Sequence, residues 1–118
     1  MSAENNKEII RKVNDAFAKN DMETFLASCA NDVRWSMVGA HGLVGADAIR
    51  EDMKTNMPSQ PPVFTVKHLI AEGEMVMCDG EMTMTQKDGK EWRGAFCDVY
   101  QMRDGKIQEL NSYIVEYR

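Results

Sequence analysis

The sequence has no cluster of positive charge and no long hydrophobic run, and each absence excludes a class of protein. Its 118 residues carry a formal net charge of −5, and the 14 lysines and arginines are scattered along the chain. Nucleic-acid and anionic-membrane surfaces need clustered basic residues, so we expect no nucleic acid and no membrane as partners. No run of about 18 apolar residues is present to form a transmembrane helix. The opening residues MSAENNKEII lack the basic and apolar regions of a secretory signal, so we expect a soluble, cytoplasmic protein.

Cysteine and histidine are also scarce, which argues against metal and redox chemistry. The three cysteines, Cys29, Cys78 and Cys97, are odd in number and lack the close pair spacing of a zinc or redox site. We therefore expect buried, reduced thiols. His41 and His68 lie far apart in the sequence, and no glycine-rich phosphate loop is present. The sequence thus predicts neither a metal nor a nucleotide cofactor.

The first part of the chain has the apolar spacing of amphipathic helices. Residues 5–19 repeat apolar side chains every three or four positions, with charged residues between them. A second, shorter helix is expected after Asp21, a good N-cap, and is expected to end before Asn31. Two adjacent N-terminal helices are therefore predicted.

A third helix is expected near the middle of the chain. A short apolar run over residues 33–38 and a loop over 39–42 precede it, and it starts near Gly45 and turns Ile49 and Met53 inward. Prolines are expected to end it: Pro58, Pro61 and Pro62.

Everything after Val63 is expected to be extended, because alternating apolar stretches are separated by turn signals, including two Asp-Gly pairs. Helices followed by an antiparallel meander predict one α+β domain over residues 1–118, with a curved sheet that buries one face against the helices. Side chains either fill the conical space inside such a sheet or leave it as a pocket. The expected strands are 63–71, 75–86, 92–103 and 106–117.

One carboxylate lies among large apolar residues in the strand expected at 92–103. Because strand side chains alternate, Phe96, Asp98 and Tyr100 share one face. A buried polar group without a partner costs roughly 2–7 kcal/mol, so Asp98 is a candidate functional residue. Alternatively, a bulge turns it outward, or it is a structural acid that accepts a hydrogen bond. The donors for that alternative are Tyr100, Tyr113, Trp35 and Trp92.

Three short motifs occur in order along nearly the whole chain: Asn31-Asp-Val-Arg-Trp35, Gly42-Leu-Val-Gly45-Ala-Asp-Ala-Ile49-Arg50 and Tyr100-Gln-Met-Arg103-Asp-Gly-Lys-Ile107. Together they resemble the SnoaL-like branch of the nuclear transport factor 2-like superfamily, which includes ketosteroid isomerase. The resemblance implies a cystatin-like cone with a pocket between the sheet and the first and third helices. It also implies proton-transfer chemistry on small apolar ketones, and a dimer formed through the outer sheet face.

The resemblance also implies a role for single residues. Asp98 matches the neutral, hydrogen-bond-donating aspartic acid of ketosteroid isomerase, a carboxyl that an apolar site keeps protonated. The general-base aspartate of that enzyme falls on Ser36 or Met37, and the tyrosine of its oxyanion hole falls on Val13. What is retained is a single acid, which resembles the polyketide cyclases more closely.

Both histidines are further candidates. His41 lies between glycines in a loop that can bend over a pocket mouth, where its imidazole can titrate near neutral pH; the alternative is a solvated loop position. His68 shares the face of Phe64 and Ile70 by strand alternation. It either lines the pocket, is hydrogen-bonded at the pocket edge, or is a structural histidine.

The pocket is expected to have apolar walls. The methionine-rich segment 75–84 either makes a pliable wall or simply fills the core. The candidate wall residues are Phe17, Trp35, Met37, Phe64, His68, Met82, Trp92 and Phe96.

These observations predict a protein that binds a small apolar molecule and acts on it, as an isomerase or cyclase, by proton transfer on a ketone-like group. Asp98 is the expected proton donor or acceptor, assisted by Tyr100 and His41. The alternative is a ligand-binding or dimerisation domain with no enzymatic activity. The outer face of the strand at 92–103 is mixed in polarity, which suits a homodimer contact.

Overall fold

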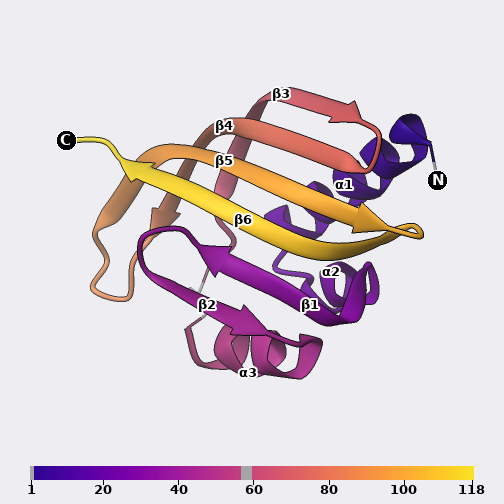
Figure 1. Ribbon diagram of the computed structural model, residues 1–118. Helices are drawn as coiled ribbons and strands as arrows, with labels where there is room; N and C mark the ends of the chain where they lie inside the picture. The colour runs from indigo at the N-terminus through magenta and orange to yellow at the C-terminus, as the bar shows by residue number, and fades with distance from the viewer. Residues whose placement is uncertain (1, 57–59) are drawn as a thin grey trace.

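The computed structural model describes residues 2–56 and 60–118 (Figure 1). Pro58 lies outside the described residues, so its expected role at the end of the third helix is not tested; that helix ends at Asn56. In chain order the elements are α1 (Ala3–Ala18), α2 (Met22–Ala27), β1 (Cys29–Met37), β2 (His41–Val44), α3 (Ala46–Asn56), β3 (Val63–Glu72), β4 (Met75–Thr85), β5 (Glu91–Arg103) and β6 (Lys106–Glu116).

The strands form one sheet in the order β2-β1-β6-β5-β4-β3. Strands β3 to β6 are an antiparallel meander, as predicted, and β1 joins this meander parallel to β6. The short run expected at 33–38 is the second half of the longer strand β1. The prediction of a loop over 39–42 is wrong for its second half. The chain turns over 38–40, and from His41 it pairs back on β1 as the edge strand β2.

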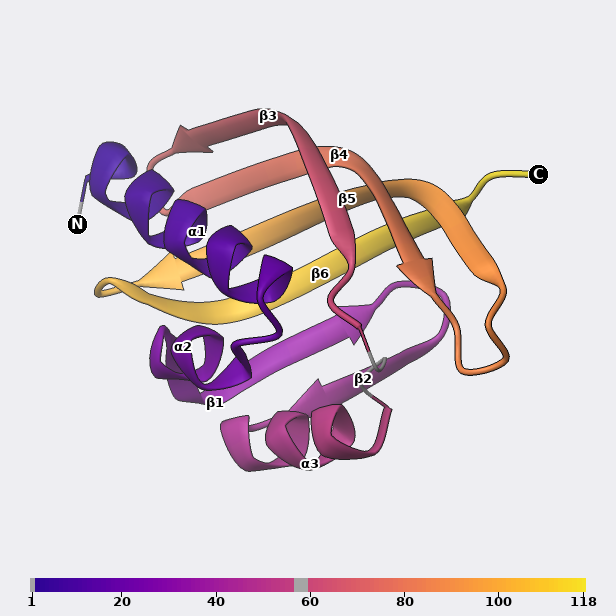
Figure 2. The ribbon, with the colours of Figure 1, turned by 180° about the vertical axis from the view of Figure 1, so that it is seen from behind.

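The sheet curves around the helices (Figures 1 and 2). Helix α1 lies across the concave face against β3 and β4, and α3 packs against β1 and β2 at the other end of the sheet. The predicted α+β class, with N-terminal helices packed on a curved and mainly antiparallel sheet, is confirmed. No helix within residues 2–56 and 60–118 has the length and apolarity to cross a membrane.

Both N-terminal helices begin at side-chain caps. The Ser2 hydroxyl accepts a backbone N–H of the first turn of α1 at 3.1 Å, and the Asp21 carboxylate accepts the backbone N–H of Thr24 at 3.2 Å. The apolar spacing of α1 then buries one face of the helix, including Ile10 and Val13. These contacts fix α1 over the sheet.

A bulge in β3 changes which residues face the helices. Val66 pairs with Gly80 and His68 pairs with the preceding residue of β4, so Lys67 is an extra residue between them. Gly80 accommodates the bend, because a Cβ there would lie 2.0 Å from the Thr65 carbonyl oxygen. Counting straight through Lys67 therefore predicts the wrong face for His68.

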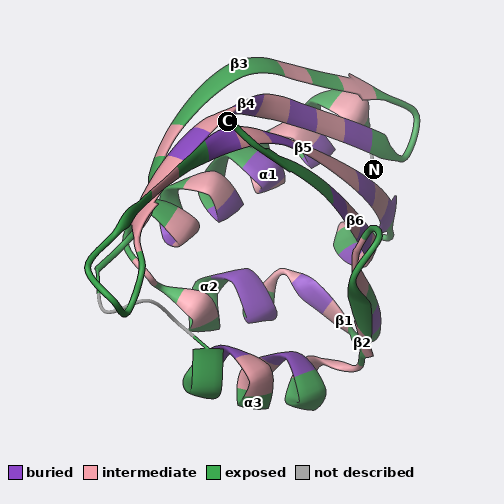
Figure 3. Ribbon diagram, turned by 90° about the vertical axis from the view of Figure 1, so that its left-hand side faces the viewer, coloured by how far each residue is buried: buried purple, intermediate pink, exposed green. Residues whose placement is uncertain are grey.

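The hydrophobic core lies between the helices and the concave face, where the buried stretches gather (Figure 3). On β5 the predicted alternation is confirmed, since Phe96, Tyr100 and Met102 are buried. Two of the three free cysteines, Cys29 and Cys78, are buried as predicted, and burial raises their thiol pKa to about 12 and about 11. The main cluster includes Ile10, Val13, Phe25, Val33, Ile49, Tyr100, Ile107 and Leu110.

Candidate functional site

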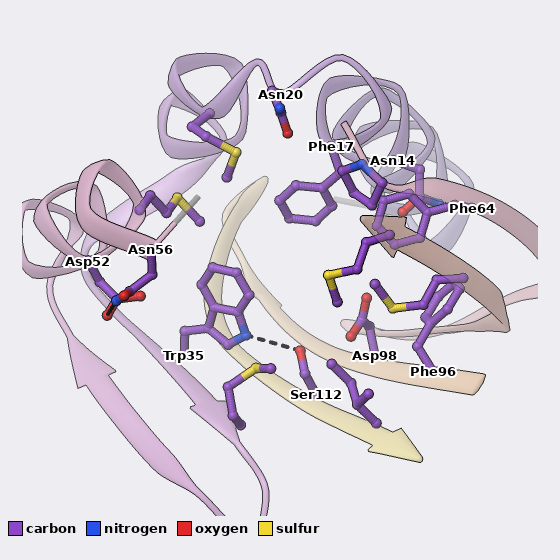
Figure 4. Close-up of a pocket in the computed structure, with 17 residues that line it drawn as sticks. Asn14, Phe17, Asn20, Trp35, Asp52, Asn56, Phe64, Phe96, Asp98 and Ser112 are labelled. Carbon is purple, nitrogen blue, oxygen red and sulfur yellow. Dashed lines mark hydrogen bonds between the residues drawn. The ribbon is translucent and has the colours of Figure 1, made fainter. Parts of the chain in front are cut away.

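A cavity of about 310 Å³ opens between the helices and the concave face of the sheet (Figure 4). Every helix and every strand except β2 contributes to its lining among the described residues. The apolar lining consists of Phe17, Met22, Trp35, Met37, Met53, Pro62, Phe64, Met82, Met84, Phe96 and Ile114. The polar lining consists of Asn14, Asn20, Asp52, Asn56, Asp98 and Ser112.

Aromatic rings form one connected wall of the cavity. The ring centroid of Phe17 lies 6.3 Å from that of Trp35 and 6.4 Å from that of Phe64, and Phe64 meets Phe96 edge-on at 5.5 Å. Such contacts hold large flat surfaces in place, so the wall is suited to a flat apolar molecule.

Asp98 projects from β5 into this apolar space (Figure 4). Burial raises the pKa of its carboxyl to about 6, and the nearby Ser112 hydroxyl lowers it in part. No cation among the described residues forms an ion pair with it. The carboxyl therefore changes its charge close to neutral pH, as a group that gives and takes protons must.

Ser112 connects Asp98 with the wall of the cavity. It is the cross-strand partner of Asp98 in β6, and it is only 3% exposed. The indole Nε1–H of Trp35 donates to Ser112 Oγ at 3.0 Å (Figure 4). The Ser112 hydroxyl also keeps its own hydrogen, which it can donate to the Asp98 carboxylate, and this contact lowers the pKa of the carboxyl.

Asn14 adds an amide on the α1 side of the cavity. Its Nδ2 donates to the sulfur of Cys78 at 3.4 Å. A primary amide carries two N–H groups, so a second hydrogen remains for a molecule in the cavity.

A second polar group lies across the cavity from Asp98, at the end of α3 (Figure 4). Asn56 Nδ2 donates to Asp52 Oδ1 at 3.0 Å, and Asn56 is exposed, so this pair lies at the solvent side. Asn20 follows α1 with a positive φ of 56°, and it also lines the cavity.

The predicted wall residues are largely brought together. Phe17, Trp35, Met37, Phe64, Met82 and Phe96 all line the cavity with Asp98. Trp92 does not line it. Its ring folds over the neighbouring inward position of its own strand, where a Cβ on Gly94 would lie 2.4 Å from the indole.

Tyr100 shares the inward face of β5 with Asp98, but it lies in the main core and is not part of the cavity lining. Its hydroxyl is fully buried and has no hydrogen-bond partner among the described residues. Burial, with the nearby Asp98 carboxylate, raises the pKa of Tyr100 well above its ordinary value. The prediction that Tyr100 assists Asp98 at the ligand is therefore wrong, because Tyr100 lies in the core and does not reach the cavity.

Neither histidine lines the cavity. His41 pairs with Met37 on the edge strand β2 and is exposed, so the position expected at the pocket mouth is wrong. His68 is on the outer face because of the extra Lys67, and its Nδ1 lies 2.8 Å from Asp79 Oδ1. His68 is therefore an exposed, hydrogen-bonded histidine and not a pocket residue.

Several lining residues were not found from the sequence. Asn14 lies four residues after Ile10 and three before Phe17, so it is a polar residue on the apolar face of α1, a signal that helical periodicity contained. Ser112 was not assigned because β6 carries large apolar side chains on both faces, Leu110 and Ile114 on one and Tyr113 and Val115 on the other, so alternation does not tell which face points inward. The other missed residues are Asn20, Met22, Asp52, Met53, Asn56, Pro62, Met84 and Ile114.

Within the part of the chain that the structure describes, no group of three or more His, Cys, Asp or Glu side chains is placed to hold a metal ion. Around Asp98 the site offers one carboxyl with a raised pKa, two neutral hydrogen-bonding side chains beside it, and apolar walls, while the second carboxyl of the lining, Asp52, lies at the solvent side. This arrangement can bind an apolar molecule and exchange a proton with it.

Comparison with solved structures identifies the same fold elsewhere. A protein of unknown function from Burkholderia pseudomallei, described as NTF2-like, has a TM-score of 0.84 and 22% identity, with 98% of this chain and 92% of that chain covered. A candidate SnoaL-like polyketide cyclase from Jannaschia sp. has a TM-score of 0.84 and 13% identity, covering 95% and 86%. A candidate ketosteroid isomerase from Kribbella flavida has a TM-score of 0.79 and 20% identity, covering 98% and 82%.

At these identities the likeness shows the nuclear transport factor 2-like fold alone. No curated protein matches the sequence significantly. The model of the SnoaL-like domain family matches residues 10–110, which span both the helices and the sheet that enclose the cavity. The chain therefore belongs to the SnoaL-like family.

Proposed function

We propose that this protein binds a small apolar ketone-like molecule and transfers a proton on it, as an isomerase or cyclase that needs no cofactor. The observation that carries the proposal is the Asp98 carboxyl, whose pKa is about 6 and which faces an apolar cavity of about 310 Å³. A base with a pKa near the working pH combines a populated basic form with an adequate affinity for the proton.

The proposed step uses Asp98 as the base. Its carboxylate takes a proton from the carbon next to the ligand carbonyl, the C–H bond breaks, and its electron pair moves to the carbonyl oxygen to give an enolate. The free N–H of Asn14 is the proposed donor to that oxygen. The proton then returns from Asp98 to carbon, at the same or a conjugated position, which regenerates the carboxylate.

Hydrogen exchange on a carbon acid tests this step directly. The probe is 2-tetralone, a bicyclic apolar ketone with acidic benzylic protons, incubated with the protein in D2O and followed by NMR. We expect exchange above the buffer rate, increasing with pH through about 6 as Asp98 ionises. Asp98→Asn is expected to lose this acceleration, because an amide does not accept the proton.

Asp15→Asn is the matched control, since it removes an exposed α1 carboxylate that is not part of the cavity lining. Its exchange rate should equal that of the parent. Acceleration that survives in Asp98→Asn would contradict the role of Asp98. Binding of 2-tetralone without acceleration would contradict the chemistry and favour the second candidate function.

That second candidate is a ligand-binding or dimerisation domain without catalysis, and the outer sheet face supports it. Ile70, Tyr113 and Val115 are exposed apolar side chains, and their strands pair with β4 and β5 to make one mixed surface. We propose that this face forms a homodimer contact. Sedimentation at micromolar concentration should give the mass of two chains, and a monomeric mass would contradict it.

A further inference from the structure

The cavity has hydrogen-bond acceptors at two opposite ends and no cation between them. Asp98 lies at the end closed by the sheet, and Asp52 with Asn56 lies at the end formed by α3 (Figure 4). Among the described residues that line the cavity, none is lysine, arginine or histidine. An anionic ligand would thus face two carboxylates without a counter-charge.

The cations nearest in sequence to Asp52 are already bound elsewhere. Arg50 forms ion pairs with Glu23 at 3.1 Å and with Asp47 at 3.0 Å. Lys54 lies 3.6 Å from Glu51. Recruiting either cation to an anionic ligand would break a contact that the structure makes.

The pair at α3 offers a ligand two free acceptors and one remaining N–H of Asn56, so acceptors outnumber donors there. One N–H of Asn56 is used on Asp52 Oδ1, while Asp52 Oδ2 and Asn56 Oδ1 accept no hydrogen bond from the described side chains. Both side chains line the same cavity as Asp98, on the opposite side (Figure 4). A hydroxyl or amine at the outer end of a ligand would satisfy these oxygens, and a carboxylate would be repelled.

We propose that the ligand is an uncharged or cationic molecule whose apolar body ends in a hydroxyl or amine directed at Asp52 and Asn56, and that Asp52 selects against anions. This inference rests on the proposed function, since it concerns the same cavity. It adds the chemical class of the ligand and a specificity-determining residue far from the reacting carboxyl.

Three ligands with the same ring system test the proposal: 2-tetralone, 6-hydroxy-2-tetralone and 2-tetralone-6-carboxylate. Their dissociation constants are measured by isothermal titration calorimetry at pH 7.5. We expect the hydroxyl compound to bind several-fold more tightly than 2-tetralone, and the carboxylate at least tenfold more weakly.

Asp52→Asn keeps the side-chain shape and the oxygen that accepts from Asn56, while it removes the charge and replaces the other oxygen with an NH2 group. It should recover several-fold affinity for the carboxylate and leave 2-tetralone unchanged. Asp15→Asn, which neutralises an exposed carboxylate outside the cavity lining and breaks none of the ion pairs of the described residues, is the matched control and should recover none. Equal or tighter binding of the carboxylate by the parent, or no effect of Asp52→Asn, would overturn the inference while the proposed function stands. Failure of all three compounds to bind would overturn the proposed function, and this inference with it.

Discussion

Replacing Asp98 with asparagine should make the protein more stable at neutral pH. Asparagine keeps the size and one oxygen of the side chain, so the Ser112 hydroxyl still has an acceptor, while the charge is removed. A carboxylate held in an apolar cavity without a cation is unfavourable for folding, and the cavity leaves room for water beside the new amide.

The magnitude follows from linkage between folding and proton binding. The carboxyl pKa is about 6 in the folded chain against 3.8 for an ordinary aspartate, which corresponds to about 3 kcal/mol. Because the folded-state pKa is raised, the contribution of Asp98 to the free energy of unfolding is most favourable below pH 3.8. That contribution is lost as the pH rises through about 6. Above that pH the full cost is present, and the amide introduced by Asp98→Asn should recover about 1–2 kcal/mol after its own burial cost.

Urea unfolding of the parent and of Asp98→Asn between about pH 4 and pH 8 measures this difference. The stability gain of the variant should grow with pH and level off above about 7. Asp15→Asn, which neutralises an exposed carboxylate, serves to subtract the general effect of net charge. A variant that is less stable than the parent at pH 7, with a difference that does not change with pH, would refute the reasoning and identify Asp98 as a structural hydrogen-bonded acid.

Two further changes probe the surroundings of this carboxyl, and a third probes the bulge in β3. Ser112→Ala should raise the pKa of Asp98 above about 6, because the hydroxyl that favours the carboxylate is lost; carboxyl ¹³C titration measures it, and an unchanged pKa would contradict the contact. Tyr100→Phe should stabilise the fold by about 1 kcal/mol in urea unfolding, since it removes a buried hydroxyl without a partner, and a loss of similar size would reveal an unseen acceptor. Gly80→Ala should cost about 2 kcal/mol or more, because its Cβ would lie 2.0 Å from a backbone oxygen of β3. Gly42→Ala, with a closest contact of 3.7 Å, is the matched control and should cost much less.

The fold followed closely from local patterns in the sequence. Caps and apolar spacing placed α1 and α2, and the Asp-Gly turns placed β5 and β6, because these signals act within a few residues. The edge strand β2 was missed because its four residues carry no strand pattern and are held only by pairing with β1. The formation of such a strand depends on tertiary contacts and not on its local sequence.

The site was predictable only where alternation runs without interruption. On β5 it does, and Phe96 and Asp98 face the cavity as predicted. On β3 one extra residue shifts the count and moves His68 outward, and on β6 the apolar side chains on both faces left Ser112 unassigned. The pair Asp52 and Asn56 has the pattern of an ordinary polar helix face, and only the packing of α3 against the sheet end brings it to the cavity.

The bulge at Lys67 has a consequence for how this strand can change length during evolution. The extra residue is taken up locally, so Phe64 and Leu69 both stay on the side of the helices although five positions separate them. Deleting Lys67 would leave every side chain on its present face and would remove the bend that crowds Gly80. Insertion or loss at this point is therefore coupled to the residue at position 80. In a homologue with the shorter strand, we expect position 80 to tolerate a side chain, because the backbone that crowds it is no longer bent toward it.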